Sequence, residues 1–146
     1  RQRQMCIRDS YTLIVKTASG TGYTMPVGAT ALVYSDGTNT SLGMLQKSYV
    51  THTAAYTAVA GDQIFCDTKT TNAFTVTLPA GSVNDEVTLI DSQNYFASNN
   101  LTIASNGSEK INSSASNLVL TANGQAITLV YANATVGWIY KTNSAS

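Results

Sequence analysis

Residues 117–131 read NLVLTANGQAITLVY, and this stretch decides the fold class. Apolar side chains alternate with small or polar ones in Asn117–Thr121 and in Ala126–Tyr131, on either side of Asn123-Gly124. A period of two is typical of a strand with one face in a core. Asn-Gly favours the positive φ angles that a type I′ turn needs at both of its central residues. The stretch therefore predicts an antiparallel β-hairpin.

Short alternating runs between turn residues continue in both directions from this hairpin. The further expected strands are Tyr11–Lys16, Tyr23–Met25, Ala31–Tyr34, Gln63–Asp67, Phe74–Leu78, Glu86–Asp91, Leu101–Ala104, Lys110–Asn112 and Gly137–Lys141. Leu42–Val50 is compatible with either a short helix or an extended crossover. Turn signals recur about every 8–12 residues, as in sandwiches and barrels. We expect an all-β fold with short antiparallel strands in a fibre-type sandwich or barrel module.

The first ten residues, RQRQMCIRDS, have no counterpart in the rest of the chain. Back-translation gives CGG CAG CGT CAG ATG TGT ATA AGA GAC AG, which resembles a transposase-type sequencing-library adaptor read in frame. We therefore expect residues 1–10 to be adaptor-derived rather than native. The expected source is a metagenomic open reading frame cut at its N-terminal end, so we exclude these residues from fold reasoning.

The rest of the chain is expected to form two modules. Residues 11–43 are predicted to be a small β-module, the C-terminal part of a truncated upstream domain. Residues 44–50 are predicted to be a linker, and residues 51–142 a β-sandwich-like fibre module. Residues 143–146, with the sequence NSAS, are typical of a frayed tail.

Composition excludes several classes of partner. Charged residues make up 11% of the chain and the formal net charge is zero, while about a third of the residues are Ser, Thr or Asn. Lysines are scattered after residue 10, so the chain lacks the basic cluster that phosphate binding requires. No apolar run approaches the roughly 20 residues of a membrane span. We expect no nucleic-acid partner and no membrane insertion.

Candidates for catalysis and metal binding each have a simpler interpretation. His52 is the only histidine, and no nucleophile-elbow pattern lies near it, so we interpret it as a surface or interface residue. Cys66 alternates with Ile64 and is expected to point into the core as a small hydrophobe. The carboxylate pair of a glycosidase would have to come from Asp62, Asp67, Asp85, Glu86, Asp91 and Glu109. Asp62, Asp85 and Glu86 stand at turn positions, and turn chemistry explains them without catalysis. We therefore predict no enzyme activity, no cofactor and no metal site.

Aromatic residues are the remaining candidates for recognition. Tyr95 and Phe96 lie in the polar stretch Ser92–Asn100, and Trp138 and Tyr140 lie on the last expected strand. An exposed ring is a common platform for sugar stacking, and nearby Asn and Ser side chains supply hydrogen bonds. The alternative for Trp138 and Tyr140 is that they fill the core, and we favour it. For Tyr95 and Phe96 we also favour the absence of a binding role.

The strand faces predict association between copies of the chain. In Phe74–Leu78, one face carries Phe74, Val76 and Leu78, whereas the other carries only threonines. A module of about 90 residues buries only about two-thirds of its unfolded surface, so its core is modest. Uncharged β-edges aggregate unless they are covered. An intertwined homotrimer would bury both the threonine faces and the edges.

Several segments resemble the tail-fibre and tail-appendage proteins of marine tailed phages. The resemblance begins with Gly22–Gly28 (GYTMPVG) and Ala31–Asn39 (ALVYSDGTN), continues with Tyr56–Thr68 (YTAVAGDQIFCDT), and covers most of residues 11–141. Later landmarks are Phe74–Gly81, Glu86–Asp91, Asn99–Ile103 and Ile127–Tyr131. Cys66 departs from the aliphatic residue expected at its position.

This resemblance implies a trimeric, elongated virion structural protein that is extracellular. Its expected function is that of a spacer or of a module for host attachment and adhesion, with a host-surface glycan or protein as a possible receptor. No catalytic residues come with the resemblance. The alternative function is that of a bacterial surface adhesin or a carbohydrate-binding module, which would be monomeric and use an aromatic sugar platform.

Overall fold

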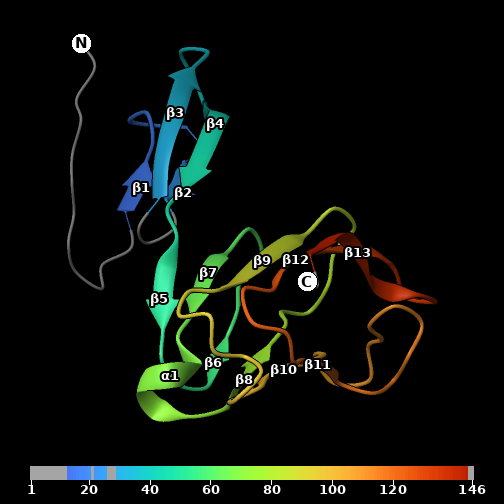
Figure 1. The fold of residues 1–146 in the computed structure, drawn as a ribbon. Helices are drawn as coiled ribbons and strands as arrows, with labels where there is room; N and C mark the ends of the chain where they lie inside the picture. Colours follow the sequence, from blue (N-terminus) through green and yellow to red (C-terminus); the bar gives the residue numbers. More distant parts are fainter. Residues whose placement is uncertain (1–12, 21, 26–28, 145–146) are drawn as a thin grey trace. The chain divides into compact units, whose positions relative to one another are not determined.

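The structure is a computed structural model that describes residues 13–20, 22–25 and 29–144. The chain divides into two compact units, Arg1–Ser48 and Tyr49–Ser146, and each is described by itself (Figure 1). The expected adaptor segment, residues 1–10, lies outside the described residues, as do Ser146 and Ala145 at the other end. Within the described residues, the regular secondary structure of both units is almost all β-strand, as the sequence predicts.

The first unit contains two antiparallel strand pairs. β1 (Leu13–Val15) pairs with β2 (Tyr23–Met25), and β3 (Ala29–Ser35) pairs with β4 (Thr40–Lys47). The β3–β4 turn contains Asp36, whose side chain accepts hydrogen bonds from the Thr38 and Asn39 backbone N–H groups at 2.8 and 2.7 Å. Thr40 Oγ1 donates to the Val15 carbonyl at 2.6 Å, which ties the two pairs together.

The observed strand β4 covers most of Leu42–Val50, the stretch for which the sequence left two interpretations open. Leu42–Val50 was compatible with a short helix or a crossover, but residues 42–47 belong to a strand that pairs with β3, with a register shift at Gly43. The predicted linker, residues 44–50, is therefore strand over most of its length. Only Ser48 and Tyr49 then separate β4 from the next strand, β5 (Val50–His52).

The second unit contains two sheets that enclose one core (Figure 1). The five-stranded sheet has the order β13-β12-β9-β7-β5, and the four-stranded sheet has the order β11-β10-β8-β6. Beyond β5, the strands are β6 (Tyr56–Thr57), β7 (Gln63–Cys66), β8 (Phe74–Thr77), β9 (Glu86–Asp91), β10 (Leu101–Ala104), β11 (Leu118–Leu120), β12 (Ala126–Asn133) and β13 (Gly137–Ser144).

The chain alternates between the two sheets, an arrangement that the sequence did not predict. From β5 to β10 each strand lies in the opposite sheet from the one before it, so that β5, β7 and β9 stack in parallel and β6, β8 and β10 do likewise. The expectation of antiparallel strands is therefore wrong for this part. Antiparallel pairing is confirmed for β10 with β11, β9 with β12 and β12 with β13.

The Asn123-Gly124 turn has a different role from the predicted one. β11 and β12 belong to different sheets, so the turn carries the chain from one sheet to the other and does not close a hairpin. Gly124 has a φ of 70°, and Gln125 N donates to the Ala122 carbonyl at 3.3 Å. Asn123 does not have a positive φ, so a type I′ turn is excluded. The turn residues were identified correctly and the strand pairing was not.

Two smaller expectations also changed. The connection between the expected strands Gln63–Asp67 and Phe74–Leu78 contains a single helical turn, α1 (Thr68–Thr71), which the Asp67 side chain caps. Lys110–Asn112 forms only isolated bridges through Ile111, to Ser114 and Trp138, in place of a full strand. No helix among the described residues is long and apolar enough to cross a membrane.

Alternating side chains of both sheets form the core of the second unit. The burial pattern of β9 and of most of β12 alternates strictly between half-buried and buried positions. Ile64, Leu89 and Ile127 are aligned across the five-stranded sheet, and all three are buried. Burial of such side chains contributes about 1.5–3 kcal/mol each. The period-two pattern of the sequence therefore identifies the inward face correctly.

Candidate functional site

Two of the four candidate recognition residues lie inside the core. The Phe96 and Trp138 side chains have no exposed surface. Trp138 packs edge-on against Tyr131, with ring centroids 5.6 Å apart, and its Nε1 donates to Glu109 Oε2 at 3.1 Å. In this structure neither Phe96 nor Trp138 presents a ring on which a sugar stacks. For Trp138, the core interpretation favoured from the sequence is confirmed.

The other two candidates reach the surface on separate elements. Tyr140 is 38% exposed on β13, the strand at one edge of the five-stranded sheet, so the favoured core role does not apply to it. Tyr95 is half-buried in the loop after β9, and the Lys69 ammonium lies 5.9 Å from its ring centroid. That distance is at the limit of a cation–π contact. Tyr95 and Tyr140 are thus the accessible rings of the predicted set.

A buried carboxylate fixes the loop that carries Tyr95. Asp91 Oδ2 accepts hydrogen bonds from the backbone N–H groups of Tyr95, Phe96 and Gly124, at 2.7, 3.1 and 3.0 Å. Asp91 Oδ1 accepts a fourth, from Gln93 N at 3.2 Å. Hydrogen bonds to an ionised acceptor are roughly twice as strong as neutral ones. Asp91 therefore holds the 92–97 loop against the 122–125 turn.

The remaining carboxylates also have structural partners. Glu109 joins two segments, since Oε1 accepts from Gly81 N at 2.9 Å while Oε2 accepts from the Trp138 indole. Asp62 Oδ2 accepts from the Tyr56 hydroxyl and from Val59 N, at 3.0 and 2.8 Å. Each carboxylate that the structure describes makes a hydrogen bond or an ion pair: Asp36, Asp62, Asp67, Asp85, Glu86, Asp91 and Glu109.

Three of these carboxylates take part in a pKa shift. Backbone hydrogen bonds from Asn39 and Thr38 hold the pKa of Asp36 below its ordinary value. Hydrogen bonds from the Thr70 hydroxyl and backbone, together with the Lys69 backbone and charge, hold the pKa of Asp67 below its ordinary value. Burial, aided by the neighbouring Asp62 carboxylate, raises the pKa of Tyr56 to about 12. The Asp36 and Asp67 shifts come from a local turn and from the cap of α1, whereas the Tyr56 shift comes first from burial.

Parallel pairing aligns three chemically reactive residue types that are far apart in the sequence. His52, Cys66 and Asp91 occupy matched positions on β5, β7 and β9. Cys66 is fully buried, and burial raises the pKa of its thiol to about 12. The nearby Asp91 charge acts in the same direction, whereas a nucleophilic cysteine needs a lowered pKa. The alignment does not produce an activated thiol.

The environment of His52 also differs from that of a catalytic base. Its ring is half-buried and stacks on Tyr56, with centroids 3.8 Å apart. Asp91 occupies the matched position on β9, two strands away from His52, and its carboxylate accepts hydrogen bonds from four backbone N–H groups. Across the described residues, no three His, Cys, Asp or Glu side chains are grouped closely enough to hold a metal ion.

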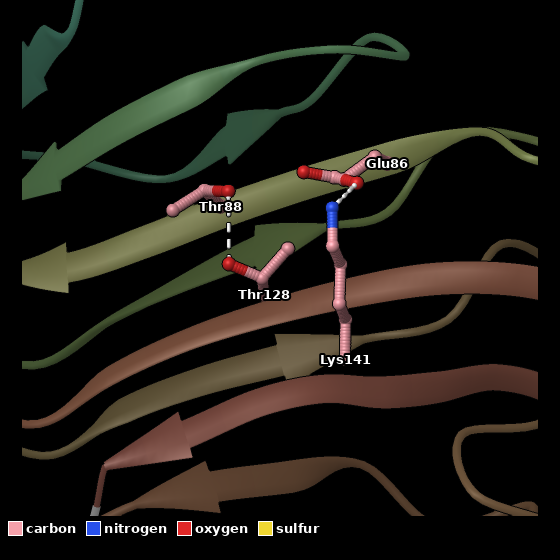
Figure 2. Close-up of polar contacts among 4 residues, drawn as sticks. All are labelled: Glu86, Thr88, Thr128 and Lys141. Atoms are coloured by element: carbon pink, nitrogen blue, oxygen red, sulfur yellow. Dashed lines mark hydrogen bonds and ion pairs between the residues drawn. The ribbon is translucent and has the colours of Figure 1, made fainter.

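The outward faces of the two sheets differ in charge. The outer face of the four-stranded sheet, here called the threonine face, carries only uncharged side chains: Thr57, Thr75, Thr77, Thr102, Ala104 and Val119. The outer face of the five-stranded sheet carries Glu86 and Lys141, which form an ion pair, and the hydrogen-bonded threonines Thr88 and Thr128 (Figure 2). Which of the two sheets has the uncharged outer face depends on strand register, and it was not predicted from the sequence.

Sequence reasoning named Asp91 only as a candidate carboxylate, and it missed both the role of Asp91 in holding the loop and the His52–Cys66–Asp91 alignment. A signal for the first exists: Asp91 ends an apolar strand and precedes a polar loop, where a carboxylate commonly binds free N–H groups. No local signal exists for the alignment, because it depends on which strands pair. No family model matches this chain, and a search of curated proteins found no match to it either.

Proposed function

We propose that this chain is a structural segment of an extracellular fibre, of the kind found in phage tail fibres and related virion appendages. It would serve as a spacer or a host-attachment module and would carry no catalytic activity. The observation that carries the proposal is the stacking of β5–β10 in two sheets with an uncharged outer face. Stacked β-modules extend in one dimension and present flat surfaces, which suits a fibre.

The use of the acidic residues supports a structural role. Every described carboxylate bonds to a loop, a cap, a side chain or a neighbouring strand. The buried thiol of Cys66 has a raised pKa. A glycan depolymerase would instead need two carboxylates directed at one cleft, with one of them raised in pKa.

The second candidate function is that of a monomeric adhesin or carbohydrate-binding module. The observation in its favour is Tyr95, a partly accessible ring beside Lys69 on a loop that Asp91 holds in place. Under this function, binding to a glycan array should fall at least tenfold in Tyr95→Ala and stay unchanged in Tyr140→Ala. A Tyr95→Ala protein that binds like the parent would exclude this site.

Light scattering coupled to size exclusion tests the fibre proposal. The expected result for the full chain is a particle of three times the chain mass of 15.4 kDa. The reason is that uncharged faces and edges leave the single chain incompletely covered. A particle of one chain mass at all concentrations would overturn the fibre proposal and favour the adhesin.

A further inference from the structure

We propose that the threonine face is the surface through which copies of this chain pack around a threefold axis. This proposal rests on the proposed function, since it names the surface that a trimer would use. The face consists of Thr57, Thr75, Thr77, Thr102, Ala104 and Val119 on β6, β8, β10 and β11. The partner is the same face of the neighbouring copies.

The charge pattern favours a second copy as the partner. Around a rotation axis, residues near the axis meet their own copies, so a charge placed there meets a like charge. Like charges in close contact cost several kcal/mol. None of the four strands of the four-stranded sheet contains a charged residue. The face is therefore able to meet copies of itself without repulsion.

The shape of the side chains points the same way. Thr75 and Thr102 are register partners on parallel strands, as are Thr57 and Thr77, so their branched side chains form short rows across the sheet. Small β-branched residues allow two sheets to approach closely and to pack without long flexible side chains. Val119, in register with Thr102, is 47% exposed in the single chain and adds apolar surface at one end of its row.

The five-stranded sheet lacks these properties. Its outer face carries Glu86 and Lys141, and their ion pair spans β12, from the edge strand β13 to β9 (Figure 2). Burial between copies would remove both charges from water, and this cost often exceeds the Coulombic gain. The five-stranded sheet is therefore assigned to the solvent side of the trimer.

Two lysine substitutions test the assignment in the full chain. Val119→Lys adds a charge to the threonine face at a position that is exposed in the single chain, so folding of the chain itself should tolerate it. Ile139→Lys is the matched control, because Ile139 is 37% exposed on β13, the edge strand of the other sheet. The expected result is that Val119→Lys reduces the particle mass from three chains to one, while Ile139→Lys leaves it at three.

A second substitution separates charge from packing. Thr102→Lys should also give one chain, whereas Thr102→Val, which keeps an uncharged branched side chain, should give three. Fluorescence of the buried Trp138 shows whether each variant is folded. If a Thr102 variant is unfolded, the particle mass of Val119→Lys decides the test.

The outcomes separate the two proposals. A parent of one chain mass overturns the fibre proposal and this assignment with it. A trimeric parent with a trimeric Val119→Lys overturns the assignment alone, and so does an Ile139→Lys protein that dissociates as readily as Val119→Lys. Loss of glycan binding in Val119→Lys without a change in mass would assign the face to a glycan and overturn its role between copies.

Discussion

The Lys141 ammonium lies 2.7 Å from the Glu86 carboxylate, although the strands that carry them are not neighbours (Figure 2). β12 lies between β13 and β9, and the side chain of Lys141 reaches across it. An irregularity in the β12–β13 register between Thr128 and Leu129 falls opposite Lys141, where β13 contains one extra residue. A bulge of this kind redirects a side chain, which explains the long reach.

Removal of this ion pair should change stability only slightly. The side chains of Lys141 and Glu86 are 56% and 40% exposed, so water and salt screen their attraction. We expect Lys141→Ala to lower the free energy of unfolding by less than about 1 kcal/mol. Urea denaturation at low and high salt measures this change, with Glu86→Gln as the reciprocal variant. A loss above about 2 kcal/mol in either variant would contradict an exposed pair.

The Asp91 carboxylate should contribute far more. In Asp91→Asn a single carbonyl oxygen replaces two carboxylate oxygens that accept four backbone N–H groups, and the amide N–H₂ faces donors. We expect a loss of about 2–4 kcal/mol of unfolding free energy, because buried donors lose a charged acceptor. Chemical denaturation followed by Trp138 fluorescence measures it.

Asp85→Asn is the matched control for Asp91. The Asp85 carboxylate accepts one backbone hydrogen bond, from Ser82 N at 2.8 Å, in an exposed turn. The expected loss is about 1 kcal/mol or less. Equal losses in the two variants would show that the four bonds to Asp91 do not act together.

Asp67 should make stability depend on pH in the acid range. Its pKa is lowered in the folded state, so its contribution is fully present above the unfolded pKa of about 3.9 and is lost as the pH falls through the folded value. Asp67→Asn retains a capping side chain but does not titrate. The difference in unfolding free energy between the parent and Asp67→Asn should therefore shrink from about pH 5 downward. A constant difference across this range would contradict the assignment of the lowered pKa.

The Cys66 thiol should resist modification in the folded protein. It is fully buried, and its pKa is raised to about 12, so at pH 8 very little thiolate is present and none of it is accessible. We expect iodoacetamide to label Cys66 only as fast as the second unit unfolds, with peptide mass mapping distinguishing it from Cys6. Labelling of Cys66 within minutes at pH 8 and without denaturant would contradict its burial.

The sequence identifies strands better than it identifies their partners. Glu86–Asp91 and Leu101–Ala104 were predicted with the observed ends, because period-two alternation and flanking turn residues are local properties. Alternation also identified the inward residues of β12. It gives no information on which strand lies alongside, so the parallel stacking of β7 on β5 and β9 was not predictable.

The same limit applies to the candidate sites. The accessibility of Tyr95 and the burial of Phe96, which is next to it, follow from the loop conformation that Asp91 imposes. Composition predicted uncharged faces, but only the register shows that the four-stranded sheet carries one and that the five-stranded sheet does not. The pairing of strands that are distant in the sequence therefore determines which residues form the threonine face, and it also determines the His52–Cys66–Asp91 alignment.

Gly137 should be the glycine of the second unit that is most sensitive to substitution. It has a φ of 74°, and a Cβ added there would lie 1.9 Å from the Lys110 carbonyl oxygen, a backbone atom fixed by its hydrogen bond from Trp138 N. Gly137→Ala therefore combines the left-handed conformation, which costs about 1–2 kcal/mol, with a backbone clash. We expect it to lower the unfolding free energy by more than about 2 kcal/mol.

Gly107→Ala separates these two effects. Gly107 also has a positive φ, of 54°, but a Cβ there would meet no atom within 4 Å. Its expected loss is the conformational cost alone, about 1–2 kcal/mol. Thermal and urea unfolding of both variants measure the difference, which reports how closely the 110–111 segment is held against β13. If Gly137→Ala loses no more than Gly107→Ala, the segment moves away at little cost, and its bridge from Ile111 to Trp138 does not stabilise the end of the five-stranded sheet.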